Sequence, residues 1–349
     1  LKILCGALEP TTGTVTVQEG LRMSVLKQDH YAYDEYTVQE TVIMGNPRLY
    51  EVMKQKDALY AKEDFTEEDG NLASELEGEF AELGGWEAES DASKLVQGLG
   101  LDESIMYAQM SSLAGNEKVK VLLAQALFGN PDIILMDEPT NHLDITACEW
   151  LEKFLTEYKG AYIVISHDRY FLDKVTDTTF EMENRTLREY KGNYTRYLEL
   201  KAEAREAQQR VYDRTVKEIN RIEGIVEQQK RWGQEHNFIT AASKQKQADR
   251  LKETLEKPED LPEAIKFTFR AKEGGANDVL IAKGLSKSFD GTAVFTNAEL
   301  DIKKNTTTFI LGENGCGKTT LLKILTGEYQ ADSGEYKFGN NIQFGYYDQ

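Results

Sequence analysis

The sequence predicts an α/β protein in which two copies of one domain are joined by an antiparallel helical hairpin. Three features predict this: an internal repeat, apolar strand-like runs that end in polar residues, and a long polar segment between the copies. Residues 1–28 align without a gap to residues 322–349, and a constant offset over that span indicates a duplication. The identical pairs are Leu1/Leu322, Lys2/Lys323, Ile3/Ile324, Leu4/Leu325, Gly6/Gly327, Gly13/Gly334 and Gln28/Gln349.

The composition is that of a chain with ordinary folded cores. Its 349 residues suffice for about two domains, and 40% of them are hydrophobic. No apolar run approaches the roughly 20 residues that span a bilayer. The net charge of −19 argues against a chain that binds nucleic acid over its whole surface. Much of the acid lies between Glu51 and Glu103, where a solvated helical face is the simplest interpretation.

The cysteines Cys5, Cys148 and Cys316 are far apart and form no CxxC pair. Neither a disulfide framework nor a zinc site is therefore predicted, as is typical of a reducing cytosol. No signal peptide is visible. The chain begins partway along a helix-like run and stops inside the second copy, so we expect an internal piece of a longer protein.

The first copy, residues 1 to about 190, is expected to start with the end of a helix at Gly6 and two short strands. From Val38 to about Leu101 the pattern is mostly helical. The expected strands are Thr14–Val17 and Met23–Leu26, and Gly-rich breaks in the helical region fall at Gly84-Gly85 and Gly98-Leu99-Gly100.

Charged residues follow two apolar strands of the first copy. The run Ile133–Glu138 ends in Asp137 and Glu138, and His167 follows the run Ala161–Ile165. Parallel α/β sheets bind ligands at the carboxyl ends of their strands. There Asp137 can hold Mg²⁺ through water, Glu138 can accept a proton from an attacking water, and His167 can donate to a phosphate. The structural alternative is a charge pair at a helix N-terminus and a helix-capping histidine.

The second copy carries a phosphate-loop motif in the expected context. Gly312–Thr319 fits G-x-x-x-x-G-K-[ST], after a predicted strand Thr306–Leu311 and before a helix Thr320–Leu325. Its glycines let backbone N–H groups surround phosphate oxygens, and the helix N-terminus adds partial positive charge. Lys318 would reach the outer phosphates and the Thr319 hydroxyl would ligate Mg²⁺. Further strands are expected at Ile265–Phe269 and Leu280–Lys283; Phe289 fits equally a base-stacking ring or a core residue.

The segment between the copies, about Asn193 to Lys257, predicts a helical hairpin. Apolar residues recur there every three or four positions, which is typical of one buried helix stripe. A second, shorter arm, Ala241–Leu255, repeats the pattern, and prolines follow it. The stripe residues are Tyr212, Val216, Ile219, Ile222 and Val226, and in the second arm Ala248, Leu251 and Leu255.

The tip of this hairpin concentrates positive charge and aromatic rings. Between Lys230 and Lys252 six basic residues stand against Glu235 and Asp249. Cations on phosphates with aromatic rings free to stack are expected for an RNA contact, whereas rings that cap the hairpin core are the equal alternative from composition. The candidate RNA-binding residues are Arg231, Trp232, His236, Asn237, Phe238, Lys244, Lys246 and Arg250.

These residues resemble the tandem cassettes of the ATP-binding cassette superfamily, over nearly the whole chain. Gly312–Thr319 is similar to its Walker A motif and Ile133–Glu138 to Walker B. Leu113–Glu117, ahead of a helix-like run Val119–Phe128, takes the place of the signature motif, and Asn141–Asp144 that of the D-loop. His167 matches the switch histidine, and Gln28 and Gln349 match the Q-loop glutamines. The wording EPTNHLD and SHDRYFLD, with a charged helical joint between two cassettes, resembles the ABC-F subfamily.

The resemblance implies two truncated P-loop cassettes and three domains: residues 1–190, 191–262 and 263–349. It implies ATP and Mg²⁺ as cofactors, with each ATP between the Walker motifs of one cassette and the signature of the other. The implied catalytic residues are Glu138 and His167. The implied ATP-binding residues are Gly312, Asn314, Gly315, Gly317, Lys318, Thr319, Thr320, Phe289, Leu113, Gly115, Glu117 and Asp144. The implied Mg²⁺ ligands, direct or through water, are Thr319, Gln349, Asp137 and Gln28.

The signature departs from the family pattern at two positions. The family has a serine and a second glycine where this chain has Ala114 and Asn116. Ala114 has no hydroxyl for the γ-phosphate, and Asn116 adds a side chain. The Gly115 backbone and the following helix start remain available, so a weaker contact is expected.

The function implied by the resemblance is a cytoplasmic, ribosome-associated ATPase whose hairpin meets ribosomal RNA and peptidyl-tRNA. It would be monomeric, with its two cassettes paired as a pseudo-dimer, and act as a translation factor or in antibiotic resistance. The alternatives are the energy-coupling subunit of a membrane transporter and a DNA-repair or chromosome-organising ATPase. Each ATP site draws motifs from outside residues 1–349, so the parent protein is expected to hydrolyse ATP and this segment alone is not.

Overall fold

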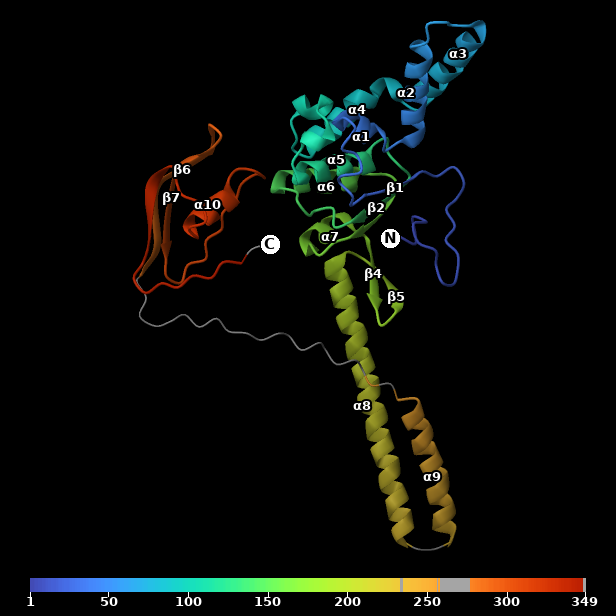
Figure 1. Ribbon diagram of the computed structural model, residues 1–349. Coiled ribbons are helices and arrows are strands. Elements are labelled where there is room, and N and C mark those ends of the chain that lie inside the picture. The colour runs from blue at the N-terminus through green and yellow to red at the C-terminus, as the bar shows by residue number, and fades with distance from the viewer. Residues whose placement is uncertain (233–234, 256, 258–276, 348–349) are drawn as a thin grey trace. The chain divides into compact units, whose positions relative to one another are not determined.

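The computed structural model describes residues 1–232, 235–255, 257 and 277–347, without the side chains of residues 232, 235–238 and 240 (Figure 1). Contacts between Cα atoms divide the chain into two compact units. One unit contains Leu1–Asp168 together with Arg270–Gln349, and the other is Arg169–Phe269.

A parallel three-stranded sheet carries the first half of the candidate site. Its order is β1 (Met23–Val25), β2 (Ile133–Asp137), β3 (Ala161–Ile165), with β2 in the middle. The central position of β2 agrees with its composition. Its residues Ile134, Leu135 and Met136 are at most 1% exposed, and apolar runs of this kind are typical of covered parallel strands. All three strands therefore end at the same edge.

Helices cover this sheet and extend from it. α5 packs against α1 and α4, and the α2–α3 pair forms a hairpin of its own. Thr37 and Thr66 begin α1 and α3 with reciprocal capping boxes, which satisfy the first free N–H groups of each helix. The helices are α1 (Val38–Ile43), α2 (Pro47–Tyr60), α3 (Glu67–Glu82), α4 (Ala88–Gly98), α5 (Gly115–Leu127) and α6 (Ile145–Glu157), with short 3₁₀ turns at Gly85–Glu87, Glu103–Tyr107 and Met110–Ser112.

The second unit is a long helical hairpin rooted on a small sheet. It consists of α7 (Arg169–Val175), the antiparallel pair β4 (Thr178–Glu183) and β5 (Thr186–Lys191), and the helices α8 (Tyr194–Trp232) and α9 (Glu235–Glu253). Lys201 of α8 forms ion pairs with Glu181 and Glu183 of β4, and Tyr197 donates to Glu181. Burial alone would raise the pKa of Glu181, but hydrogen bonds from Lys201 and Tyr197 lower it. The root of α8 is thus fixed to β4.

The hairpin core is the stripe expected from the sequence. Ile222, Val226, Ala241 and Ala248 are at most 2% exposed, and Leu251 packs against them. Lys252 of α9 also bridges to Glu223 of α8 at 2.6 Å. The prediction that the stripe is hairpin core is confirmed.

The second copy forms an antiparallel sheet with one helix against it. The order is β7 (Thr292–Lys303), β6 (Asp278–Phe289), β8 (Ser333–Phe338). The helix α10 (Lys318–Leu325) buries Leu321 and Leu325 against Leu280, Ala282 and Leu285 of β6.

Two expected strands are wrong. Thr14–Val17 and Thr306–Leu311 have no regular secondary structure, and neither pairs with a strand in the described part of the chain. A strand needs a hydrogen-bonded neighbour, and these segments are solvent-exposed, with Phe309 83% and Leu311 74% accessible. The expected strand Ile265–Phe269 lies outside the described residues. In the part of the chain that the structure describes, every helix is too short or too polar to cross a bilayer.

Candidate nucleotide site and hairpin surface

The carboxyl end of β2 brings three of the predicted site residues together. Asp137 ends β2, Glu138 follows it, and His167 lies two residues beyond β3. The His167 N–H donates to Glu138 Oε2 at 3.3 Å, and His167 Nε2 lies 3.5 Å from Glu138 Oε1. Their exposures differ: the His167 side chain is 98% exposed and that of Glu138 21%. An accessible histidine therefore stands beside a largely buried carboxylate.

Glu138 has an uncommon backbone conformation and an unsatisfied oxygen. Its φ is +50°, in the left-handed region that non-glycine residues seldom occupy. Its N–H donates to Ile165 O at 2.8 Å, which anchors the turn to β3. Glu138 Oε1 is buried and has no hydrogen-bond partner among the described residues, since 3.5 Å to His167 is too long for one. Burying an acceptor without a donor costs free energy, so this carboxylate is held ready for a donor.

The signature segment lies at the start of α5. Leu113 is half-buried, Ala114 and Gly115 are exposed, and Gly115 begins the helix. The Glu117 carboxylate accepts from the Ala114 N–H at 2.9 Å, so it caps its own helix. In the described structure the N–H groups of Gly115 and Asn116 have no acceptor, and the thirteen-residue helix adds its dipole. This end of α5 presents what an anion requires.

Both carboxylate oxygens of Asp144 accept hydrogen bonds from other residues of the first copy. It caps α6 by accepting from the Ala147 N–H at 2.9 Å, and it accepts from Lys120 Nζ of α5 at 2.8 Å. The two side chains of this ion pair are 3% and 10% exposed. Burial alone would raise the pKa of Asp144, but the Lys120 and Ala147 hydrogen bonds lower it below its ordinary value. Asp144 thereby ties the signature helix to the D-loop.

Gln28 follows β1 at the same edge of the sheet as Glu138. Leu26 N–H donates to Leu135 O at 2.9 Å, which continues the parallel pairing beyond β1, and Gln28 itself is exposed. Its counterpart Gln349 lies outside the described residues.

The phosphate loop of the second copy is formed and accessible. Gly315 and Gly317 have φ of +82° and +94°, and Gly317 caps α10. Lys318 Nζ donates to the Gly312 and Glu313 carbonyls at 2.7 and 2.6 Å, so its ammonium lies on its own loop. The remaining predicted residues of the loop are exposed or half-buried: Asn314, Thr319 and Thr320.

Phe289 lies at the end of β6, before the hairpin turn, and is 43% exposed. Its ring meets Tyr329 edge-on, with 5.7 Å between the centroids, and Lys287 Nζ lies 5.3 Å from the Phe289 centroid. This exposure argues against a fully buried core role, and the base contact stays a prediction.

The oxygen donors at these loops suit Mg²⁺. Carboxylate and hydroxyl oxygens, which Asp137 supplies at one proposed site and Thr319 at the other, are ligands that this ion prefers. Among the described residues no cluster of three or more His, Cys, Asp or Glu could hold a metal alone. The donor set therefore fits an ion that arrives with a phosphate ligand, as Mg²⁺ usually does.

The hairpin cations fall into two groups. Lys252 forms an ion pair with Glu223. Lys244 is half-buried. The pKa of Glu218 is lowered mainly by its hydrogen bond from Arg221 and to a smaller extent by the charge of Lys244. Lys246 and Arg250 are exposed on α9, away from the Ala241–Ala248 core side.

The tip itself is only partly described. Arg231 is 82% exposed, with Glu227 at 3.9 Å. The side chains of Trp232, His236, Asn237 and Phe238 lie outside the described residues.

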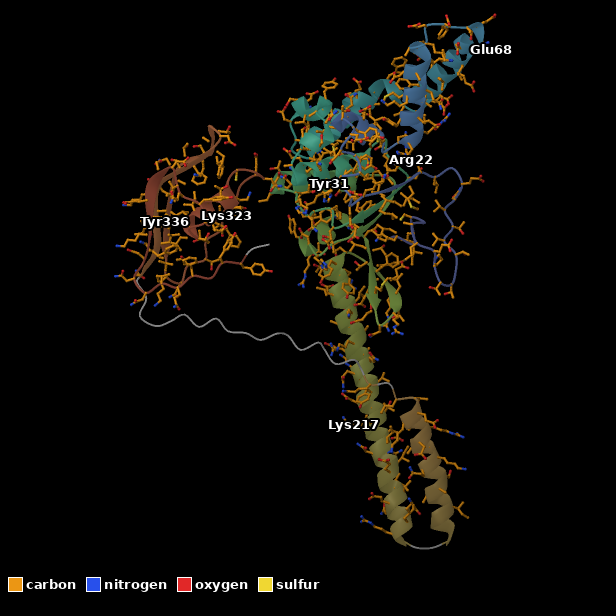
Figure 2. All side chains as sticks on the ribbon, in the orientation of Figure 1. Arg22, Tyr31, Glu68, Lys217, Lys323 and Tyr336 are labelled. Atoms are coloured by element: carbon orange, nitrogen blue, oxygen red, sulfur yellow. The ribbon has the colours of Figure 1, made fainter. Side chains whose placement is uncertain are left out.

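Two sets of residues were missed by reading the sequence. Arg210, Arg214, Lys217 and Arg221 are exposed on α8 at helical spacing, a signal that was present in the chain (Lys217 is labelled in Figure 2). Lys118 and Lys120, by contrast, are 4% and 3% exposed. Their burial follows from contacts with distant segments, which no local pattern reports.

Comparisons with known proteins identify related chains. A family model described as ABC transporter matches residues 1–141 and 295–346, which is more than half of the chain, and a second model with that description matches residues 180–269. The uncharacterized ABC transporter ATP-binding protein YkpA of Bacillus subtilis (strain 168) is 44% identical over 99% of this chain and 64% of its own length.

Other relatives also align along the whole chain. The probable ATP-binding protein YbiT of Escherichia coli O157:H7 is 38% identical over 100% of this chain and 65% of its own length. The energy-dependent translational throttle protein EttA of Mycobacterium tuberculosis (strain CDC 1551 / Oshkosh) is 30% identical over 100% of this chain and 62% of its own. The chain therefore spans less than two thirds of each of these three relatives.

The chain belongs to the ATP-binding cassette family, and its fold is the α/β P-loop cassette with a helical insertion. Within that family it is a member of the ABC-F subfamily, as are the three relatives. The expected family and fold class are confirmed. The domain bounds 1–190, 191–262 and 263–349 and the individual ligand-binding roles stay predictions.

Proposed function

We propose that the protein binds Mg²⁺ and ATP at paired cassette sites and hydrolyses ATP with Glu138 as the general base. The observation that carries this proposal is Glu138 Oε1, which is buried at the carboxyl end of β2, has no donor among the described residues and lies next to an exposed histidine. Perturbed or unsatisfied buried carboxylates concentrate at catalytic sites.

Each residue near β2 has a separate task. Glu138 accepts a proton from the attacking water, and His167 donates a hydrogen bond to the phosphate that is transferred. Asp137 and Gln28 hold the metal, Asp137 through water, and bound Mg²⁺ neutralises phosphate charge. Asp144 acts by positioning the D-loop, because Lys120 and Ala147 already occupy its oxygens.

The phosphate loop and the signature serve a second ATP together. Gly312, Asn314, Gly315, Gly317, Lys318, Thr319 and Thr320 hold its phosphates and metal, Phe289 stacks on its base and Gln349 joins the metal. Leu113, Gly115 and Glu117 close that site from the other cassette, where the free N–H groups of Gly115 and Asn116 at the start of α5 would meet the phosphate. The missing hydroxyl at Ala114 makes this contact weaker than a serine would.

A comparison of two glutamates tests the ATPase proposal. The protein is expressed with any sequence that flanks residues 1–349 in its gene, and phosphate release is measured with Mg²⁺ and ATP. Glu138→Gln should lower turnover by roughly 10²–10⁴-fold, the usual contribution of a general base, while leaving ATP binding intact. The control is Glu149→Gln, an exposed position on α6. Equal turnover in both variants would exclude Glu138 as the base.

The hairpin α8–α9 is the proposed RNA-binding element. Its exposed cations Arg231, Lys246 and Arg250 stand out in a chain of net charge −19, and cations on phosphates supply most of the affinity of such contacts. The relative named as an energy-dependent translational throttle points to translation. We therefore propose a monomeric, cytoplasmic, ribosome-associated protein whose hairpin meets ribosomal RNA and peptidyl-tRNA, as a translation factor or a resistance protein.

A second candidate is the ATP-binding subunit of a membrane transporter. The description of the family models favours it. Cell fractionation separates the two functions. A ribosome-associated factor sediments with ribosomes, whereas a transporter subunit sediments with membranes that contain its permease.

A further inference from the structure

Lys118 is a buried cation directly after the signature. It lies in the first turn of α5, one residue after Leu113–Glu117, and is 4% exposed. Its ammonium forms an ion pair with Asp34 and lies 4.9 Å from the centre of the Tyr31 ring, which Figure 2 labels. A buried ammonium is costly unless it is paired, so this geometry binds Lys118 to the 31–34 segment.

The segment that receives Lys118 is the continuation of the Gln28 loop. Tyr31 N–H donates to Asp29 Oδ1 at 3.1 Å, and Asp34 N–H donates to Tyr31 O at 3.3 Å. These turns run without interruption to Thr37, which caps α1. The chain between Asp29, next to Gln28, and α1 is therefore held by a series of local turns that includes Asp34.

The end of the same loop also forms backbone hydrogen bonds with residues that precede the signature. Val38 N–H donates to Ala108 O at 3.0 Å, and Met110 N–H donates to Tyr36 O at 2.9 Å. The signature is thus fixed to one loop by backbone bonds ahead of it and by the Lys118 ion pair behind it. Only the second link is made by side chains, so a substitution can remove it and leave the backbone bonds in place.

We propose that Lys118 is a positioning residue that couples the two nucleotide sites. This inference rests on the proposed function, in which Gln28 belongs to the ATP site of its own cassette and Leu113–Glu117 to the site of the other. When Gln28 engages its metal and nucleotide, the loop moves Asp34, and the ion pair with Lys118 turns the start of α5. Nucleotide at one site then changes the affinity of the other, and the change is reciprocal.

A coupling factor measures this link. Calorimetric titration with a non-hydrolysable ATP analogue and Mg²⁺ gives the affinity of the site that contains Gln28 and Glu138. The titration is done with the other site intact and with that site disabled by Lys318→Ala. The ratio of the two affinities is the coupling factor, which commonly lies between about 5 and 150. The protein carries any sequence that flanks residues 1–349 in its gene.

Three substitutions separate coupling from stability. Lys118→Met removes the cation and keeps the stem. Asp34→Asn removes the same link from the other side, at a side chain that is 35% exposed. Lys56→Met is the matched control: Lys56 is also a buried lysine paired with a carboxylate, Glu77, and lies over an aromatic ring, Phe80, but in the α2–α3 hairpin.

The inference predicts that Lys118→Met and Asp34→Asn each lower the coupling factor at least about 5-fold, toward 1, while Lys56→Met leaves it within about 2-fold. The affinity of the Gln28 site measured alone should stay unchanged in all three. An unchanged coupling factor in both link variants overturns the inference, as does a coupling factor of 1 in the unmodified protein. If the unmodified protein does not bind the analogue, the proposed function fails as well, so the two failures are distinct.

Discussion

Glu138 adopts a strained conformation to present its carboxylate. A left-handed backbone costs a residue with a Cβ roughly 1–2 kcal/mol, and the bond from Glu138 N–H to Ile165 O holds it there. Strain of this kind persists where surrounding structure enforces it, which is typical of functional sites. The sequence alone predicts that Glu138 follows a buried strand. It predicts neither the positive φ of Glu138 nor a buried oxygen that has no partner among the described residues.

Gly317 is the loop position where a side chain has the least room. A Cβ there would lie 2.5 Å from Val294 Cγ1, whereas a Cβ at Gly315 would meet nothing within 4 Å. Both glycines have positive φ, so alanine strains either one. We expect Gly317→Ala to destabilise the protein by about 1 kcal/mol more than Gly315→Ala, because β-branched Val294 adjusts poorly. Thermal unfolding of the two variants measures the difference; equal midpoints would show that the clash is relieved elsewhere.

The Lys120–Asp144 pair predicts an acid-sensitive contribution to stability. The folded state lowers the pKa of Asp144, so its contribution is full above the ordinary aspartate pKa of about 3.9 and is lost as pH falls through the lower folded value. Asp144→Asn should therefore destabilise the protein by about 3 kcal/mol at pH 7, because it leaves Lys120 buried and unpaired, and by less near pH 3.

Urea denaturation between pH 7 and pH 3 measures this pH dependence. The exposed pair of Asp91 with Lys94 is the control, since surface pairs contribute little, and Asp91→Asn should change stability only slightly. A cost of Asp144→Asn that is the same at every pH would contradict the assigned pKa direction.

The hairpin α8–α9 is stabilised by its own narrow core. Ile222 is fully buried there, whereas Val211 on the same helix is 62% exposed. Ile222→Ala should destabilise the hairpin by about 2–5 kcal/mol, while Val211→Ala should change it little. Hydrogen exchange of the α8 and α9 amides is the direct measurement. Equal protection in both variants would mean that the hairpin does not depend on this core.

Elements with a local signal were predictable and those set by distant partners were not. The run Ala161–Ile165 is a strand with the expected bounds, and the periodic stripe of α8 is buried. Thr306–Leu311 has the apolar pattern of a strand but no pairing in the described structure, so pattern alone misled. The long β6–β7 hairpin was missed although Asp290-Gly291, both with positive φ, is a typical two-residue turn.

The candidate site was predictable to a similar degree. Motif spacing identified Asp137, Glu138 and His167, and the structure brings the last two within 3.5 Å. The engagement of Asp144 with Lys120 was not predictable, because the two residues are far apart in sequence and meet only when α5 packs near α6. Long-range packing of this kind decides which motif residues are free to touch a ligand.

The whole molecule combines two cassettes with a basic hairpin in an otherwise acidic protein. The acid is concentrated elsewhere: on the α2–α3 hairpin, four basic side chains are all paired, and Glu68, labelled in Figure 2, is among the exposed acids. Such a charge distribution favours the proposed RNA contact at α8–α9 over one at α2–α3.

The most direct test of the central claim is co-sedimentation of the Glu138→Gln protein with ribosomes, with ATP and with ADP, over a range of salt. We expect retention with ATP and release with ADP. Lys246→Gln with Arg250→Gln should weaken retention and flatten its salt dependence by roughly one unit of slope per lost phosphate contact. Lys153→Gln with Lys159→Gln, two exposed cations of the first cassette, should have no effect. Sedimentation that is independent of nucleotide and equal in the two double variants would contradict the account.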